Sequence, residues 1–469
     1  MAACSKHHPP GPKGWTTVLR TAPSRRSSLL ADGMMNRPVY VNKTNRPPIA
    51  FAAAMVGLLV WYAVLSWARP QPVADEAYHV PAIRALARGD WQVVRTLPMP
   101  ATYHWVAALP VRWLGGDLWV MRGFNVLLSV VTWLFFWSAA DRDDPTNVAG
   151  RLLRFAWHPL LCPLWVLVYT DLAGLLAVIA ALAFYLRRQH VRAATAVFLA
   201  GLVRQSNVVW CVWLALSALW EQRGGTAQQC ARTFTGAAGE SGQMGELGLR
   251  PGGARVALPY VAALLVSSGL LAAAGAFGGA LWPENRPRFN PAQFYCLSLT
   301  VALLWLPIWL PHLAAVWPRW LATALLRPRG CALLIAAVGV LELAFRNPHP
   351  WNADLNYLRN WALVGLTRYS LIRYLGALTI VALLISLSDL FWHSRQRRRL
   401  LALWATTCVF LGGHYLVDPR YYVVPLVLLD FFAPLTDRQA RQLTVWYLLL
   451  SLGVAAFIVL QPGGWNGVW

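Results

Sequence analysis

An ionisable cluster, Asp75-Glu76-Ala77-Tyr78-His79, follows the first apolar stretch of the chain. Charged groups are costly beside hydrocarbon, so carboxylates next to an apolar wall mark a candidate site for chemistry at the bilayer surface. A carboxylate in such a place acts as a base or binds a cation. The spacing Asp-Glu-x-x-His suits a metal only on one regular helix, and Pro81 disfavours that helix. We therefore predict a site without a metal.

The elements that must position this cluster are membrane spans. The chain has 469 residues, of which 57% are hydrophobic and 13% charged. Apolar segments of about 15 to 25 residues recur along it, the length that crosses a hydrocarbon core as a helix. We therefore predict an all-α polytopic integral membrane protein with about 11–14 transmembrane helices. The expected spans are Ile49–Trp67, Leu118–Ala139, Phe155–Val168, Leu172–Leu186, Val191–Val203, Val208–Trp220, Val256–Leu281, Phe294–Trp317, Cys331–Phe345, Leu371–Phe391, Leu400–Tyr415, Tyr421–Leu435 and Leu443–Leu460.

The polar ends of the chain are expected to lie outside this membrane region, which we place at residues 48–461. Residues 1–47 are basic and rich in Pro and Ser, so they predict a cytosolic tail rather than a cleavable signal peptide. Residues 462–469 form a short C-terminal tail. The seven cysteines are scattered without a Cys-x-x-Cys pair, so we expect neither a disulfide framework nor zinc.

The net charge of +22 has a topological explanation. When the loops are assigned alternately to two sides, 27 of the 41 Lys and Arg residues gather on the side of the N-terminal tail. An excess of basic residues marks the cytosolic side, so the N-terminus is expected in the cytosol and no nucleic-acid partner is expected. The loop 221–255, rich in Gly, Gln and Ala, falls on this side.

The opposite side, facing the lumen or exterior, receives the unusual polar residues. It contains the long loop 69–117 and short corners that lie far apart in sequence. Because these corners are predicted at one membrane face, we expect their side chains to converge there. The corners are Tyr169-Thr170-Asp171, Arg204-Gln205-Ser206-Asn207, Trp282–Gln293, Arg346–Ser370 and Asp418-Pro419-Arg420.

At these corners the sequence resembles the endoplasmic-reticulum α-1,2-glucosyltransferases that attach the terminal glucose of the lipid-linked N-glycan precursor. Asp75-Glu76-x-Tyr78-His79-x-Pro81 is similar to the family's Asp-Glu-x-Phe-His-x-Pro signature, and four further motifs agree in order and spacing. These are Tyr169-Thr170-Asp171-x-x-Gly174, Arg204-Gln205-Ser206-Asn207-x-x-Trp210, His349-Pro350 with Ala353-Asp354, and Pro419-Arg420-Tyr421-Tyr422-x-x-Pro425. The resemblance runs from about residue 55 to 430.

The resemblance implies a multi-span glycosyltransferase of the GT-C type, in the endoplasmic-reticulum membrane with its site facing the lumen. Its donor would be dolichyl phosphate glucose and its acceptor a lipid-linked oligosaccharide, with no further cofactor. A β-linked donor giving an α-1,2 product requires inversion by one base, and the departing phosphate requires positive charge or hydrogen-bond donors. In the run Arg95–Tyr103, only a basic residue, one proline and Tyr103 agree with the family, so contacts to the acceptor are expected to differ.

We assign the base to Asp75, with Glu76 as the alternative, because neighbouring side chains point in different directions. Asp75 also has a purely structural interpretation as the cap of a short helix beginning near Pro81. Arg204 requires a partner at bilayer depth, either a lipid phosphate or Asp171, and the same choice holds for Arg420 beside Asp418. The residues expected to bind substrate are Glu76, His79, Tyr103, Asp171, Arg204, Gln205, Asn207, His349, Asp354, Arg420 and Tyr421.

Two alternatives remain open from the sequence. One is a transferase of the same pathway that uses another dolichyl phosphate sugar, since several motif residues are replaced. The other is a non-catalytic transporter or a regulator of other membrane proteins. Transporters often contain internal repeats and paired broken helices, which this sequence does not display.

Overall fold

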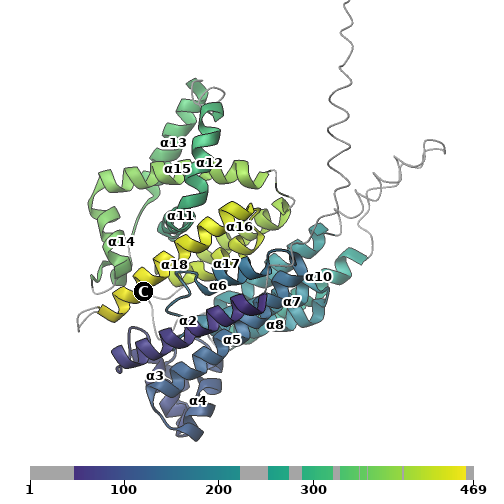
Figure 1. Ribbon diagram of the computed structural model, residues 1–469, viewed down its shortest axis with the longest axis vertical. Coiled ribbons are helices and arrows are strands. Elements are labelled where there is room, and N and C mark those ends of the chain that lie inside the picture. Colours follow the sequence, from purple (N-terminus) through teal and green to yellow (C-terminus); the bar gives the residue numbers. More distant parts are fainter. Residues whose placement is uncertain are drawn as a thin grey trace, which may run out of the picture. The chain divides into compact units, whose positions relative to one another are not determined.

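The computed structural model describes residues 47–221, 252–273, 288–320, 328–347, 349–355, 358–392, 394 and 396–460. Within these ranges every regular element is a helix, which confirms the all-α class (Figure 1). The expected tail 1–47 except Pro47, nearly all of the loop 221–255, and the C-terminal tail 462–469 lie outside the described residues.

Five described helices are long and apolar enough to cross a membrane. They are α2 (Pro47–Ala68), α5 (Leu118–Asp143), α10 (Gly252–Ala273), α15 (Ser370–Trp392) and α18 (Asp437–Leu460). Each coincides with an expected span. The protein is therefore an integral membrane protein.

A sixth span is divided. The sequence predicts one helix over Phe294–Trp317, whereas the structure has α11 (Ala292–Leu304) and α12 (Leu306–Trp320), bent by 90° at Trp305. The Trp305 indole donates a hydrogen bond to Asp430 Oδ1 at 2.7 Å, which holds the bend against a distant part of the chain.

The remaining apolar segments form shorter helices. The 11–14 transmembrane helices expected from the sequence include these shorter ones. Residues 210–221 are helical as well. In Figure 1, α7 lies beside α5 and α8 and packs against both, while α12 and α13 both pack on α15. The shorter helices are α7 (Thr170–Leu186), α8 (His190–Val203), α13 (Pro328–Ala344), α16 (Arg397–Gly412) and α17 (Val423–Phe432).

The expected span Phe155–Val168 is wrong. The helix α6 (Val148–Ala156) ends at Trp157, and the chain then runs through hydrogen-bonded turns as far as Tyr169. Pro159 and Pro163 explain this, because proline lacks the N–H that a helix interior needs. The turns are buried, and their exit places the Tyr169-Thr170-Asp171 corner at the start of α7.

Several short elements carry the expected loop segments. Val80, Ile83 and Leu86 of α3 pack against Tyr103 and Met121 in a separate apolar cluster. The elements are α3 (Glu76–Ala87), η1 (Trp91–Thr96), α4 (Thr102–Leu114), η2 (Gln205–Val209), η5 (Pro350–Ala353), α14 (Leu358–Arg368) and η6 (Pro419–Tyr422).

Candidate functional site

Three of the polar corners meet in one pocket. It is lined by Asp171 at the start of α7, by Arg204, Ser206 and Asn207 around η2, and by Arg420 of η6. Tyr421, Val423, Val424 and Phe410 complete the wall. The structure thus brings together Asp171 and Arg420, which are 249 positions apart in sequence.

Asp75 joins this pocket through an ion pair with Arg420 Nη1. Its backbone N–H donates to the hydroxyl of Tyr169 at 3.2 Å. Asp75 precedes α3, but its carboxylate makes no capping hydrogen bond to that helix. The interpretation of Asp75 as a helix cap is therefore wrong, and its side chain, 26% exposed, faces a cation instead.

Arg420 is fixed from the other side by Asp418. The Arg420 Nη2 and Nε atoms lie 2.6 and 3.0 Å from Asp418 Oδ2, and the Asp418 side chain is fully buried. The Arg420 guanidinium also lies over the ring of Tyr169, 5.3 Å from its centroid. Only the edge that carries Nη1 is thus directed at Asp75.

Asp75 and Arg420 both keep their charges at neutral pH. Burial by itself raises the pKa of Asp75, but the nearby Arg420 guanidinium outweighs it and holds that pKa below its ordinary value. Burial lowers the pKa of Arg420, yet Asp418 and Asp75 together raise it above its ordinary value. At neutral pH Asp75 is therefore a carboxylate and Arg420 a guanidinium.

Glu76 has a structural role. It is fully buried, and its Oε2 and Oε1 atoms lie 2.6 and 3.0 Å from Nη2 and Nε of Arg122. Its carboxylate also accepts the backbone N–H groups of Val73 and Val168 at 2.9 and 3.0 Å. These four donors occupy both carboxylate oxygens. The expectation that Glu76 is the alternative base or a substrate ligand is therefore corrected, and its carboxylate anchors Arg122 and the backbone around it.

Arg122 is a residue that the sequence analysis missed. It stands within the first turns of α5 and also donates to the carbonyl oxygen of Arg69 at 2.6 Å. The sequence did contain a signal for Arg122, because an arginine inside a predicted span requires a partner. The Glu76–Arg122 pair ties the start of α3 to α5 and so fixes where Asp75 stands.

A pair of histidines lies behind Asp75. Nδ1 of His79 is 3.0 Å from Nε2 of His104, a residue of α4 that the sequence analysis did not select. Burial lowers the pKa of His79 to about 4 and that of His104 to about 3, so both rings are neutral. No described group bonds to the buried Nδ1 of His104. A proton on His104 Nδ1 would have no acceptor, and buried N–H groups rarely lack one. We therefore place the His104 proton on Nε2, which donates to His79 Nδ1, and the His79 proton on its own Nε2.

Tyr103 supports the histidines rather than the pocket. Its hydroxyl donates to Asn125 Oδ1 at 2.8 Å, and its ring meets those of His79 and His104 edge-on. Tyr103 is buried. The expected substrate-binding role of Tyr103 is therefore replaced by a packing role, since the hydroxyl is already bonded.

Arg204 forms an ion pair with Asp171, which was one of the two expected partners. Its guanidinium lies over the ring of Tyr421, 5.5 Å from the centroid. Gln205 donates to the carbonyl oxygen of Pro98 at 3.4 Å. Arg204, Asp171 and Tyr421 line the pocket together, while Gln205 connects the corner to the first long loop.

Asn207 explains a glycine of the second motif. A Cβ built on Gly174 would lie 2.5 Å from Asn207 Nδ2, closer than real side chains approach. A larger residue at this position would therefore displace the Asn207 amide, which lines the pocket.

His349 and Asp354 belong to a second group of residues around η5. The His349 ring packs against Trp351 and Tyr415 at 5.5 and 5.1 Å, and the backbone carbonyl of Asp354 accepts a hydrogen bond from Asn360 at 2.6 Å. Next to Tyr415, His414 packs against Tyr421 with the ring centroids 4.1 Å apart and the planes tilted by 43°. His349 thus packs on Tyr415, whose neighbour in sequence, His414, contacts the pocket residue Tyr421.

The pocket lies toward the end of α5 that carries Arg122. Along α5, Arg122 and Asp143 are 21 residues apart, about 32 Å at about 1.5 Å per residue. This matches a hydrocarbon core of about 30 Å. Arg122 is at the end of α5 near Asp75, where several tryptophans are exposed, as at a membrane–water interface. They are Trp67, Trp91, Trp105, Trp113 and Trp119.

Metal ligation was weighed for this cluster from the sequence. Among the described residues, no three His, Cys, Asp or Glu side chains are grouped in a way that would hold a metal ion. Independence from metal stays a prediction that activity measurements must test.

Comparison with known proteins agrees with the resemblance drawn from the motifs. Residues 69–246 match the model of the DIE2/ALG10 family. Over 173 residues the chain is 28% identical to the Dol-P-Glc:Glc(2)Man(9)GlcNAc(2)-PP-Dol alpha-1,2-glucosyltransferase of Arabidopsis thaliana, covering 32% of this chain and 34% of that protein. The alignment thus spans about a third of the relative's length. No solved structure matches.

Proposed function

From the match of residues 69–246 to the DIE2/ALG10 family, we propose that this protein is a dolichyl-phosphate-glucose-dependent α-1,2-glucosyltransferase. It transfers glucose with inversion to a lipid-linked oligosaccharide, forming the terminal α-1,2-linked glucose of the N-glycan precursor. The observation that carries the proposal is the Asp75–Arg420 pair beside Arg204, because it brings a carboxylate and two guanidinium groups together around one pocket.

In this proposal Asp75 is the general base. It takes the proton of the acceptor hydroxyl as the oxygen attacks the anomeric carbon from the side opposite the phosphate. One bond forms to the acceptor oxygen and one breaks to the phosphate oxygen, and the leaving dolichyl phosphate keeps the electron pair. No second carboxylic acid is needed, because a phosphate leaves as a stable anion.

Arg420 and Arg204 are proposed to receive the phosphate. Both guanidinium groups line the pocket, and charge-assisted hydrogen bonds from arginine to phosphate are strong and geometrically specific. In this proposal Arg420 keeps its ion pair with Asp418, whereas the partner of its Nη1 atom changes. A donor phosphate at this edge would take the place of Asp75 and release the Asp75 oxygens for the acceptor.

His104 is expected to position His79 for this step. We expect His104→Phe to lower kcat by up to about tenfold with little change in KM, the kinetic equivalent of losing one hydrogen bond of about 1 kcal/mol. His104→Gln, whose amide can donate to His79 Nδ1, should recover most of the rate. Steady-state kinetics of the two variants test this, and equal losses in both would contradict it.

The proposed location is the endoplasmic-reticulum membrane, with the pocket facing the lumen and the N-terminus in the cytosol. This orientation rests on the distribution of basic loops. The donor would enter from the membrane and the oligosaccharide from the aqueous side. Single cysteines introduced at Trp91 and at Arg142, probed with an impermeant thiol reagent on intact microsomes, should be protected and labelled, respectively. The reverse pattern would refute the orientation.

The reaction is tested with the purified full-length protein in lipid nanodiscs. Dolichyl phosphate glucose and dolichyl phosphate mannose are each offered with a lipid-linked oligosaccharide that lacks the terminal glucose. We expect one hexose to be added from the glucose donor only, with an α-1,2 linkage shown by glycosidase digestion and mass spectrometry. Transfer from the mannose donor instead would favour the neighbouring-transferase alternative, which the altered run Arg95–Tyr103 keeps open.

Metal independence is a separate prediction. Excess EDTA should leave the initial rate within about twofold of the untreated enzyme, because two guanidinium groups supply the positive charge that a metal would otherwise provide. A loss of activity that Mg²⁺ or Mn²⁺ restores would contradict this prediction.

A further inference from the structure

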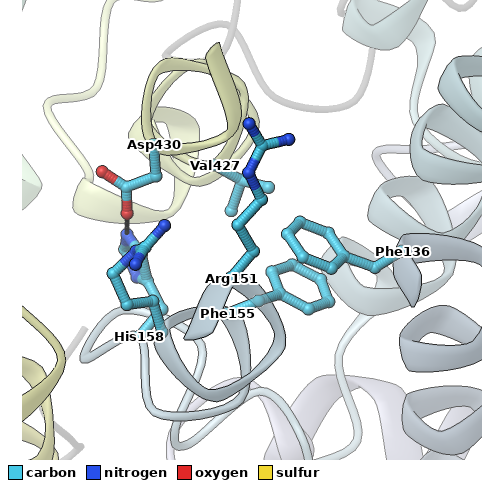
Figure 2. Close-up of a pocket in the computed structure, with 7 residues that line it drawn as sticks. Phe136, Arg151, Phe155, His158, Val427 and Asp430 are labelled. Atoms are coloured by element: carbon cyan, nitrogen blue, oxygen red, sulfur yellow. Dashed lines mark ion pairs between the residues drawn. The ribbon is translucent and has the colours of Figure 1, made fainter. Parts of the chain in front are cut away.

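A second pocket lies toward the other end of α5. Figure 2 shows it between α5, α6 and α17, with the rings of Phe136 and Phe155 on one side and the Asp430–His158 contact on the other. The space measures about 240 Å³ including its open mouth, and its inner end has room for about one water-sized atom. Its lining residues are Phe136, Arg151, Arg154, Phe155, His158, Val427 and Asp430.

Arg154 is the unusual member of this pocket. It is 4% exposed, and its Nη1 is buried without a hydrogen-bond acceptor among the described residues. Among the described residues the other deeply buried arginine is Arg122 of α5, which bonds to Glu76 and to backbone carbonyl groups. A buried guanidinium that lacks such partners indicates a missing acceptor.

His158 points to the same missing group. Its Nδ1 accepts the backbone N–H of Leu160 at 3.3 Å, so the ring proton is on Nε2. This Nε2 is buried and has no hydrogen-bond partner in the described structure, since Asp430 Oδ2 is 3.7 Å away. Two buried donors, Arg154 Nη1 and His158 Nε2, are therefore open in one pocket.

The carboxylates nearby are already engaged. Asp430 accepts hydrogen bonds from Trp305 at 2.7 Å and from Tyr447 at 2.9 and 3.1 Å. Arg151, the second cation of the lining, pairs with Asp143 at 2.7 Å. Asp430 is close enough to influence Arg154 but forms no ion pair with it within 4.0 Å. The open donors thus favour an oxyanion from outside the chain.

The position of the pocket indicates which oxyanion is available. It lies near the Arg151–Asp143 pair, toward the end of α5 opposite Asp75, and apart from Arg151, Arg154, His158 and Asp430 its lining is apolar. Phospholipid phosphates are abundant at this depth, and basic pockets between membrane helices bind lipid head groups. A phosphodiester carries one negative charge at all physiological pH values and two free oxygens that suit arginine.

We propose that this pocket binds the phosphodiester group of a phospholipid through Arg154 and His158. One free phosphate oxygen accepts hydrogen bonds from Arg154 Nη1 and His158 Nε2, and the rest of the headgroup lies outside the inner end, on the side of the partly exposed Arg151. The proposal does not depend on the glucosyltransferase reaction, because it concerns the opposite end of α5.

Thermal unfolding of the delipidated full-length protein in detergent tests the site. Phosphatidylcholine at about a hundred times its Kd should raise the Tm of the natural protein by about 5 °C, whereas diacylglycerol, which lacks phosphate, should not. Arg154→Met should lose most of this shift without lowering the lipid-free Tm, because it removes a buried charge that has no partner. Arg142→Met, at an exposed arginine in the last turn of α5, is the matched control and should keep the shift.

Each outcome bears on the proposal. If inorganic phosphate alone gives the Arg154-dependent shift, the pocket is a phosphate site filled from solution. If the shift is equal in Arg154→Met, or equal with diacylglycerol, the proposal is overturned. Where Arg154→Met does not yield monodisperse protein, His158→Phe, which lacks the Nε2 donor, replaces it. Native mass spectrometry should then count one retained phospholipid fewer than in the natural protein, and an unchanged count would contradict the site.

Discussion

Asp75→Asn should abolish sugar transfer while the protein stays folded. Asparagine has the shape of aspartate but cannot take a proton at neutral pH, so we expect kcat to fall by about 10²- to 10⁴-fold. This corresponds to about 3 to 5 kcal/mol of barrier. Folding should survive because Arg420 keeps its pair with the buried Asp418.

Single-turnover kinetics with dolichyl phosphate glucose, together with a melting curve, measure both halves of this expectation. Asp117→Asn is the matched control, because Asp117 is an exposed carboxylate in the same long loop and should be dispensable. Asp75→Glu should keep part of the rate. If Asp75→Asn retained more than about a tenth of the natural rate, Asp75 would not be the base.

Glu76→Gln should destabilise the protein by about 3–5 kcal/mol, the usual cost of leaving one partner of a buried ion pair without its counter-charge. The glutamine amide would also place an N–H where the carboxylate now accepts the backbone N–H groups of Val73 and Val168. Glu76 thus differs from its neighbour Asp75, because its replacement acts through folding.

Melting temperature and detergent-resistant yield of Glu76→Gln measure this effect. The matched control is Glu342→Gln, because Glu342 pairs with Arg373 at 2.5 Å while both side chains are about one-fifth exposed. A partly exposed pair costs less to break than a fully buried one, so the control should melt closer to the natural protein than Glu76→Gln does. If Glu76→Gln kept the natural stability but lost activity, the prediction would be contradicted and Glu76 would take part in the reaction.

The sequence by itself determined the class of the protein and the members of the pocket. Apolar stretches of membrane-crossing length are set by composition, so α2, α5, α15 and α18 followed directly from the pattern. The polar corners were recognisable because a charge beside hydrocarbon needs a reason. Asp75, Asp171, Arg204 and Arg420 were all selected in this way, and they meet around one pocket.

Only the tertiary structure decided what each of these charges does. Asp75 and Glu76 are adjacent carboxylates with the same local sequence signal, yet one faces Arg420 at the pocket and the other is sealed against Arg122. His104, Arg154 and the bend at Trp305 likewise depend on partners that lie far away along the chain. Burial and ion pairing are set by contacts between distant segments, and a pattern of neighbours along the sequence does not contain them.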